Sequence, residues 1–178
     1  QRQMCIRDSS RTPALIAQTI ASLDILSNGR AILGLGSSGK AVVEGWHGVP
    51  FDSPLARTRE YIQIIRSALA GDTVNHQGKF YQMERFRMIS PPVQEHLPIY
   101  IASLGPRNLS LTGEVSDGWL PIWLNRERVP DLKELVSAGA AKSGRNITDV
   151  TVAPYLMCYT SEGPEDLAHG CLLYTSPS

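Results

Sequence analysis

Short apolar runs that alternate with helical segments are the feature that most restricts the fold of this chain. Four such runs are each followed by a loop and a further element; they lie at residues 31–35, 99–102, 118–122 and 150–159. Continuous apolar strands are typical of parallel strands buried on both faces, and the helices between them supply the crossover connections. The sequence therefore predicts an α/β fold with a parallel sheet covered by helices.

Caps and chain breakers set the limits of the helices. A first helix is predicted from Thr12, a capping residue followed by proline, to the stop at Asn28. A second is predicted from Leu55 to Ala70, started by Pro54 and ended by Gly71. The second helix has a buried apolar face, formed by Tyr61, Ile62, Ile65, Ala68 and Leu69. Its charged residues are expected to remain in water, namely Arg57, Arg59, Glu60 and Arg66.

Residues 73–98 interrupt this alternation. Short strand-like segments on either side of Gln77 and Gly78 predict a small hairpin, and the prolines that follow predict an irregular segment. We expect the two histidines of this insertion, His76 and His96, to face solvent.

A glycine-rich loop follows the first strand. Residues 34–39 match the G-x-G-x-x-G pattern of dinucleotide-binding folds, and Asp52 lies where a ribose-binding carboxylate would be sought. An open doubly wound sheet and a (β/α)8 barrel both fit the alternation of strands and helices. However, Gly45, Gly48 and Pro50 break the long helix that the dinucleotide pattern requires, so the sequence argues against that reading.

Composition excludes several classes of function. The 178 residues carry 17 basic and 17 acidic side chains without a run of lysine or arginine, which argues against nucleic acid and anionic membranes as partners. No apolar run approaches the roughly 20 residues that a membrane helix needs. Cys5, Cys158 and Cys171 form neither a disulfide framework nor a metal-ligand spacing, so we expect a cytoplasmic protein without a metal site.

The two ends of the chain lack periodic patterning. Residues 1–9 and 171–178 resemble translated sequencing-adaptor sequence, and we exclude both from the predicted fold. We therefore expect one domain over residues 10–170, with the insertion at about 73–98, and we expect it to be an internal fragment of a longer protein.

Several motifs keep their order and spacing over residues 11–159. In chain order they are LDILSNGRAILGLG, EGWHGVPF, GKFYQM, IASLGP and GEVSDGW. Together they closely resemble the luciferase-like oxidoreductase superfamily, in particular its members that depend on the deazaflavin coenzyme F420. The resemblance implies a partial (β/α)8 (TIM) barrel that supplies about strands four to seven, since an intact barrel needs about 250 residues.

The resemblance also implies a cofactor at the carboxyl ends of the strands: coenzyme F420 or, alternatively, FMN. The binding positions that it carries over to this chain are Gly36, Ser37, Ser38 and Gly39 after the first strand, and Ala102, Ser103, Leu104 and Gly105 after the second. Glycines let the backbone approach a ligand closely, and N–H groups and hydroxyls can bind a phosphate. The first loop could equally be a tight turn that binds nothing.

Few polar residues are candidates for proton transfer. Glu44 and His47 follow the glycine loop and are our catalytic candidates, because an imidazole can pass a proton and a carboxylate can stabilise charge. Alternatively, Glu44 caps local backbone, and Trp46 packs in the core. Further along, we expect Asp117 to bond to the backbone and Trp119 to pack.

Ile122, Trp123 and Leu124 indicate the kind of substrate. F420 enzymes of this superfamily that oxidise a sugar phosphate carry a hydroxyl and a lysine at this place, so the resemblance favours an apolar organic molecule here. A strand that runs into a buried helix would give the same pattern.

Three functions remain for the chain. The first is hydride transfer between F420 and an organic substrate, the second an FMN-dependent monooxygenase reaction, and the third non-catalytic flavin binding. We expect the full-length protein to be a homo-oligomeric enzyme. This chain alone should be inactive and should self-associate or stay partly unfolded, because a half barrel leaves its edge strands and inner face without partners.

Overall fold

The computed structural model of the chain describes residues 4–7, 11–122 and 124–155. Its main sheet has five parallel strands in the spatial order β1-β2-β5-β6-β7. These strands are β1 (Met4–Arg7), β2 (Leu33–Gly36), β5 (Ile99–Ile101), β6 (Gly118–Trp119) and β7 (Thr151–Val152). The predicted parallel α/β sheet is confirmed.

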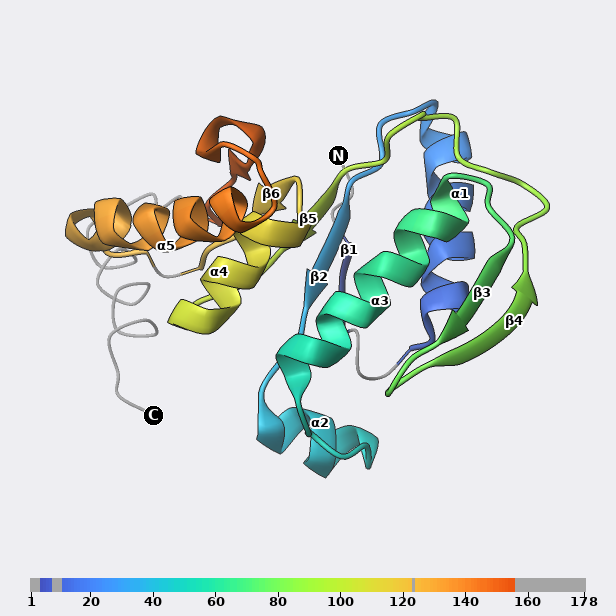
Figure 1. The fold of residues 1–178 in the computed structure, drawn as a ribbon, viewed down its shortest axis with the longest axis horizontal. Coiled ribbons are helices and arrows are strands. Elements are labelled where there is room, and N and C mark those ends of the chain that lie inside the picture. Colours follow the sequence, from blue (N-terminus) through green and yellow to red (C-terminus); the bar gives the residue numbers. More distant parts are fainter. Residues whose placement is uncertain (1–3, 8–10, 123, 156–178) are drawn as a thin grey trace, which may run out of the picture.

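The helices of the described residues group at two ends of the molecule. They are α1 (Pro13–Ser27), α2 (Lys40–His47), α3 (Pro54–Leu69), α4 (Pro106–Val115) and α5 (Val129–Lys142), with short 3-10 helices η1 (Arg126–Arg128) and η2 (Ile147–Asp149). In Figure 1, α1 and α3 lie at one end of the molecule and α4 and α5 at the other, with β2 between them. Helix α2 stands at the end of β2.

Helix α1 begins and ends where the sequence predicts. The Thr12 hydroxyl accepts a hydrogen bond from the Leu15 N–H at 3.3 Å, and Pro13 occupies the first helical position. Asn28 ends the helix in the left-handed conformation, with φ of 55°. Its N–H bonds back to helix carbonyls, as a C-terminal cap requires.

A buried carboxylate ties α1 to the insertion. Asp24 is 0% exposed and accepts hydrogen bonds from the N–H groups of Ala31 (3.2 Å), Val93 (2.8 Å) and Gln94 (2.9 Å), and from the Gln94 side-chain amide (2.7 Å). Burial raises the pKa of the Asp24 carboxyl, but these bonds outweigh burial and hold the pKa below its ordinary value. The irregular segment of the insertion is therefore fixed to α1.

Helix α3 buries all five apolar residues that the sequence predicts. The prediction that its charged residues stay in water is wrong. Arg59 pairs with Glu114 of α4 (Nη2 to Oε2 2.7 Å), Arg66 pairs with Asp117, and the Glu60 side chain is only 14% exposed. Their partners lie far away in the sequence, so helical periodicity could not reveal them.

The insertion contains the predicted hairpin. Strands β3 (Val74–Gln77) and β4 (Gln82–Phe86) pair antiparallel. The His96 side chain is 63% exposed, as predicted, but the His76 side chain is only 22% exposed, so that prediction is wrong. Since alternate residues of a strand share a face, His76 lies on the same face as the buried Val74, toward α3.

Two hydrophobic clusters flank the sheet. The first joins α1, α3 and the hairpin to the buried side chains of β2 and β5, while the second joins Leu109, Trp119, Val136 and Val150. The second cluster depends on close packing of α4 against α5. At that contact Gly113 faces the backbone of α5, and Gly139 faces the backbone of α4.

Two elements differ from the sequence prediction. Met4–Arg7 forms strand β1 in register with β2, although residues 1–9 were excluded from the fold. A four-residue strand is too short to show a period of its own. Helix α2 was not predicted; its eight residues end at Gly48, which confirms that no long helix follows the glycine loop. Residues 171–178 lie outside the described residues.

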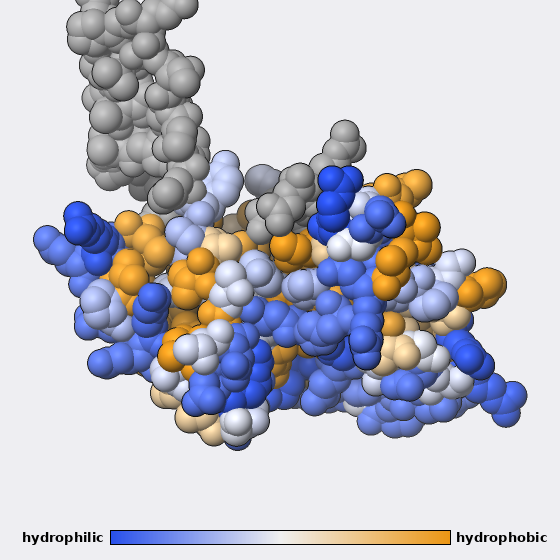
Figure 2. Space-filling model, turned by 90° about the horizontal axis from the view of Figure 1, so that it is seen from above, coloured by the Kyte–Doolittle hydropathy of each residue, from blue (hydrophilic) through white to orange (hydrophobic). Residues whose placement is uncertain are grey.

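Large apolar side chains remain exposed on this chain. Figure 2 shows apolar residues in several patches among polar ones on the face seen from above. The most exposed of them are Leu26, Trp46, Val93, Ile89, Leu104 and Tyr155. Trp46 is 72% exposed, so the alternative that it packs in the core is wrong.

Candidate functional site

The loops that follow β2 and β5 meet at one pocket. It has a volume of about 570 Å³ and lies at the carboxyl ends of these two neighbouring strands. Its walls are formed by Leu35, Gly36, Ser37, Ser38, Gly39, Ala102, Ser103, Leu104, Gly105, Asn108, Leu120 and Ile122. The structure thus brings together all eight residues that we predicted to bind a cofactor.

The loop after β2 turns sharply and leads into α2. Ser38 has a φ of 59°, which is uncommon for a residue with a side chain, and Gly39 caps the helix without a side-chain hydrogen bond. A Cβ on Gly36 would lie 3.5 Å from the Ala102 Cβ, so the two loops touch here. A Cβ on Gly39 would meet nothing within 4 Å, which leaves open space beside its backbone.

The loop after β5 is held rigidly from behind. The buried Ser103 hydroxyl shares a hydrogen bond of 2.8 Å with Thr112, and the Ser103 carbonyl accepts one of 3.0 Å from the Trp119 indole N–H. Trp119 is 0% exposed, which confirms the prediction that it packs. Further along the loop, Gly105 is the N-terminal cap of α4 and makes no side-chain hydrogen bond. The space beside Gly105 is open.

The pocket's electrostatics come from backbone rather than from charged side chains. None of the described residues that line it is charged. Instead, the N-terminal ends of α2 and α4 both begin at the pocket, at Gly39 and Gly105. A helix N-terminus carries a partial positive charge and free N–H donors, and is therefore a favourable place for a phosphate or carboxylate.

The two catalytic candidates do not line this pocket. Glu44 accepts a hydrogen bond from the Phe51 N–H at 3.1 Å and lies 3.8 Å from Lys40, so it serves as a local cap. His47 is exposed near the end of α2. Asp52, the residue sought for a ribose in the dinucleotide reading, instead pairs with Arg57 at 2.8 Å.

Only part of the apolar segment after β6 lines the pocket. Ile122 lines the pocket, together with Leu120, which the sequence reasoning missed. Leu124 instead packs against the second hydrophobic cluster, and Trp123 lies outside the described residues. Asn108 was also missed, although its place one turn into α4 could have suggested it.

Asp117 lies away from the pocket, in the turn that leads into β6. It accepts hydrogen bonds from the Ile99 N–H (2.8 Å) and from Arg66, and lies 2.9 Å from His96 Nε2. Burial raises the pKa of the Asp117 carboxyl, but these partners outweigh burial and lower it. The predicted backbone-bonding role of Asp117 is confirmed.

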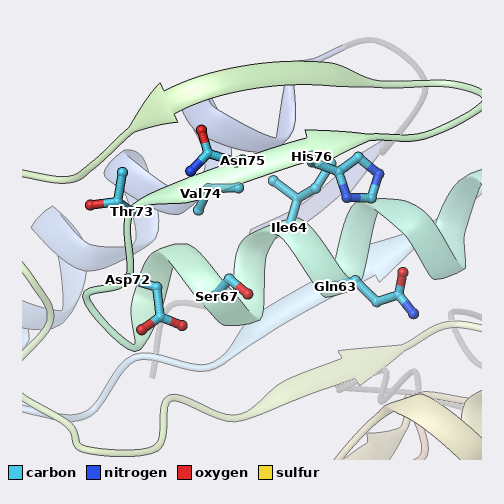
Figure 3. Close-up of a pocket in the computed structure, with 8 residues that line it drawn as sticks. All are labelled: Gln63, Ile64, Ser67, Asp72, Thr73, Val74, Asn75 and His76. Atoms are coloured by element: carbon cyan, nitrogen blue, oxygen red, sulfur yellow. The ribbon is translucent and has the colours of Figure 1, made fainter.

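A second pocket lies away from the strand ends, between α3 and the hairpin. It has a volume of about 390 Å³, and Figure 3 shows its lining side chains. From α3 and the turn after it come Gln63, Ile64, Ser67 and Asp72, and from the start of the hairpin come Thr73, Val74, Asn75 and His76.

Two negative findings hold for the described residues. No helix among them is long and apolar enough to cross a membrane. Within the same ranges, no group of three histidine, cysteine or acidic side chains could hold a metal ion.

Parallel strands joined by helices, with a pocket formed by the loops at their carboxyl ends, define an α/β protein whose site lies at the strand ends. The family model described as luciferase-like monooxygenase matches residues 5–174. The chain belongs to this family.

Two curated relatives are similar over most of the chain. One is a "Putative coenzyme F420-dependent oxidoreductase" of Mycobacterium tuberculosis, 40% identical over 151 residues, which are 78% of this chain and 44% of the relative. The other is a 5,10-methylenetetrahydromethanopterin reductase of Methanolobus tindarius, 38% identical over 149 residues, 82% of the chain and 44% of the relative. The chain thus spans less than half the length of these relatives.

Solved structures agree on the fold. The coenzyme F420-dependent tetrahydromethanopterin reductase of Methanopyrus kandleri matches with a TM-score of 0.75 at 28% identity, over 82% of this chain and 46% of that one. The monooxygenase RslO1 of Streptomyces bottropensis matches with a TM-score of 0.79 at 21% identity, over 93% of this chain and 52% of that one. The chain is therefore a partial (β/α)8 barrel with an insertion.

Proposed function

We propose that the chain is part of an enzyme that transfers a hydride between coenzyme F420 and an apolar organic substrate. The observation that carries this proposal is the pocket at the strand ends, where the loops after β2 and β5 meet in a lining without charged side chains. The names of the curated relatives and of the first solved structure, which refer to F420, support the choice of cofactor.

The residues present fit an anionic, ring-containing cofactor. Open space beside Gly39 and Gly105 lets a ligand approach the N–H groups at the starts of α2 and α4, which suit a phosphate. Ser37 and Ser38 add hydroxyl donors in the same wall. When bound, the deazaflavin would supply the hydride chemistry, while this chain would bind and orient it.

The apolar part of the pocket suggests the kind of substrate. Leu104, Leu120 and Ile122 are among its lining residues, and apolar side chains of this kind exclude water and favour an apolar substrate. Neither Glu44 nor His47 lines the pocket, so we no longer assign them a catalytic role and leave the acid or base unassigned.

The test uses a longer protein, in which this chain is joined to its flanking sequence. We expect that sequence because the relatives are more than twice as long as the matched part. F420 binding is followed by fluorescence, and any copurified cofactor by absorbance. Ser37→Asp places a carboxylate in the wall and should weaken F420 binding by roughly tenfold or more, because like charges repel in a partly desolvated site. Ser90→Asp, at an exposed position outside the pocket, is the matched control.

The outcomes separate the candidate functions. If FMN copurifies and the protein uses oxygen to oxidise an apolar substrate, the F420 proposal is wrong and the FMN-dependent monooxygenase function takes its place. Binding of flavin without turnover would support the non-catalytic alternative, and failure to bind either cofactor would refute both enzyme proposals. As part of the same proposal, we place the enzyme in the cytoplasm with no nucleic-acid partner, which its few cysteines and balanced charge support. We also propose that the full-length protein is a homo-oligomer.

A further inference from the structure

The tip of the β3–β4 hairpin is fastened to α3 by one carboxylate. Glu60 Oε1 accepts a hydrogen bond from the Lys79 N–H (2.8 Å), and Oε2 accepts bonds from the N–H groups of Phe80 (2.8 Å) and Tyr81 (2.9 Å). Burial raises the pKa of the Glu60 carboxyl, but the three backbone bonds and the nearby His76 outweigh burial and lower it. The carboxylate is therefore ionised while it holds the tip.

A histidine stands beside this carboxylate with an unused nitrogen. His76 Nε2 is buried, lies 3.7 Å from Glu60 Oε1, and makes no hydrogen bond within the described part of the chain. Gly78 makes this approach possible, because a Cβ there would overlap both the Glu60 carboxylate and His76 Nε2. A buried polar atom without a partner is uncommon and calls for an explanation.

The His76 ring borders the second pocket, and its side chain is 22% exposed. Gln63 and Ser67 of α3 line the same pocket, and Figure 3 shows all three side chains. The Nε2 atom of His76 is buried, on the side of the Glu60 carboxylate.

The other charged groups around the tip are engaged elsewhere. Arg57 and Lys79 stack on the Phe80 ring, at 4.8 Å and 5.2 Å from its centre. Arg57 also pairs with Asp52. Because arginine and lysine keep their charge near neutral pH, they cannot supply a change of charge at the tip in this range.

We propose that Glu60 and His76 form a proton-controlled latch, which sets how tightly residues 78–81 are held on α3. With His76 neutral, the tip is held by the three backbone bonds to Glu60. A proton on His76 makes both ring nitrogens donors and places a positive charge 3.7 Å from Glu60 Oε1, so that a charged hydrogen bond from Nε2 can hold the carboxylate in place. In stronger acid Glu60 itself is protonated, and the latch opens.

The test is hydrogen exchange of the amides at residues 79–81, expressed as protection factors so that the intrinsic effect of pH on exchange cancels. In the wild-type chain, we expect protection to be roughly fivefold higher at about pH 5.5 than at about pH 8. His76→Phe should abolish this rise while leaving protection at the higher pH within about twofold. Glu60→Gln should reduce protection roughly tenfold or more at both pH values, because it removes a charged acceptor.

Two controls separate the latch from general stability. Glu84→Gln, at an exposed position of β4, should leave the exchange of residues 79–81 unchanged. Amides of α1 report whether a variant still folds. The proposal is overturned if wild-type protection does not depend on pH in this range, or if His76→Phe keeps the rise. Retention of full protection by a folded Glu60→Gln variant would also overturn it.

Discussion

Gly113→Ala should destabilise this chain although alanine is the better helix former. A Cβ at Gly113 would overlap the Val136 carbonyl oxygen of α5 and lie 2.7 Å from the Ala140 nitrogen. Both are backbone atoms, so a rotamer change cannot relieve the contact and α5 must move away. Overpacking of this kind costs about 1–3 kcal/mol, or more where backbone must shift, whereas the gain in helix propensity is about 1 kcal/mol.

Because backbone must shift here, the cost lies at the upper end of this range, and the expected net loss in the free energy of unfolding is about 2 kcal/mol. Gly45→Ala is the matched control: Gly45 lies within α2, and a Cβ there would meet nothing within 4 Å. That substitution should stabilise the chain by up to about 1 kcal/mol. Urea unfolding followed by circular dichroism, at low protein concentration, measures both variants.

The two variants should shift the unfolding midpoint in opposite directions. Gly139→Ala probes the same contact from α5, since its Cβ would overlap the Ser110 carbonyl oxygen and lie 2.8 Å from the Ser110 Cα. If Gly113→Ala were as stable as the wild type or more so, α4 and α5 would not pack backbone to backbone, and the reasoning would be wrong.

Three further outcomes are expected. Asp24→Asn should lower the free energy of unfolding by about 2–4 kcal/mol, because an ionised acceptor of four buried or partly buried hydrogen bonds is replaced by a neutral amide; thermal unfolding checks this. The pKa of Asp117 is lowered in the folded chain, so its contribution is complete above its ordinary value of 3.8 and lost as pH falls through the lower folded value. With Asp117→Asn, the free energy of unfolding, measured at a series of acidic pH values, should therefore fall less as pH decreases. The chain alone should elute as oligomers in size-exclusion chromatography, because edge strands and apolar side chains are exposed; a protease-resistant monomer would contradict this.

The sequence predicts the location of the pocket better than it predicts the residues that do chemistry there. Parallel strands place their carboxyl ends at one edge of a sheet, so loops after neighbouring strands must meet, and residues 36–39 and 102–105 do. Their binding role stays a prediction. The choice of Glu44 and His47 relied on nearness in sequence to the glycine loop, yet the direction of α2 carries both away from the pocket.

The missed contacts share one physical cause. Glu60 bonds to residues about twenty positions away, and Arg66 pairs with Asp117 fifty-one positions away. Helical periodicity reports only which face of α3 meets the apolar core. It carries no information on which polar neighbour later covers the rim of that face, because that depends on the path of the insertion and of α4.

The walls of the pocket depend on both hydrophobic clusters. Its first loop continues β2, which belongs to the first cluster, whereas Ser103 is held by Trp119 of the second. A displacement of either cluster therefore changes the distance between the walls without altering a lining residue. Because Gly113→Ala acts on the helices that enclose Trp119, it should weaken ligand binding at the pocket more than Asp24→Asn does, even if both variants lose the same stability. Asp24 lies near the C-terminal end of α1 and bonds to the segment that leads into β2, whereas the pocket lies at the other end of that strand.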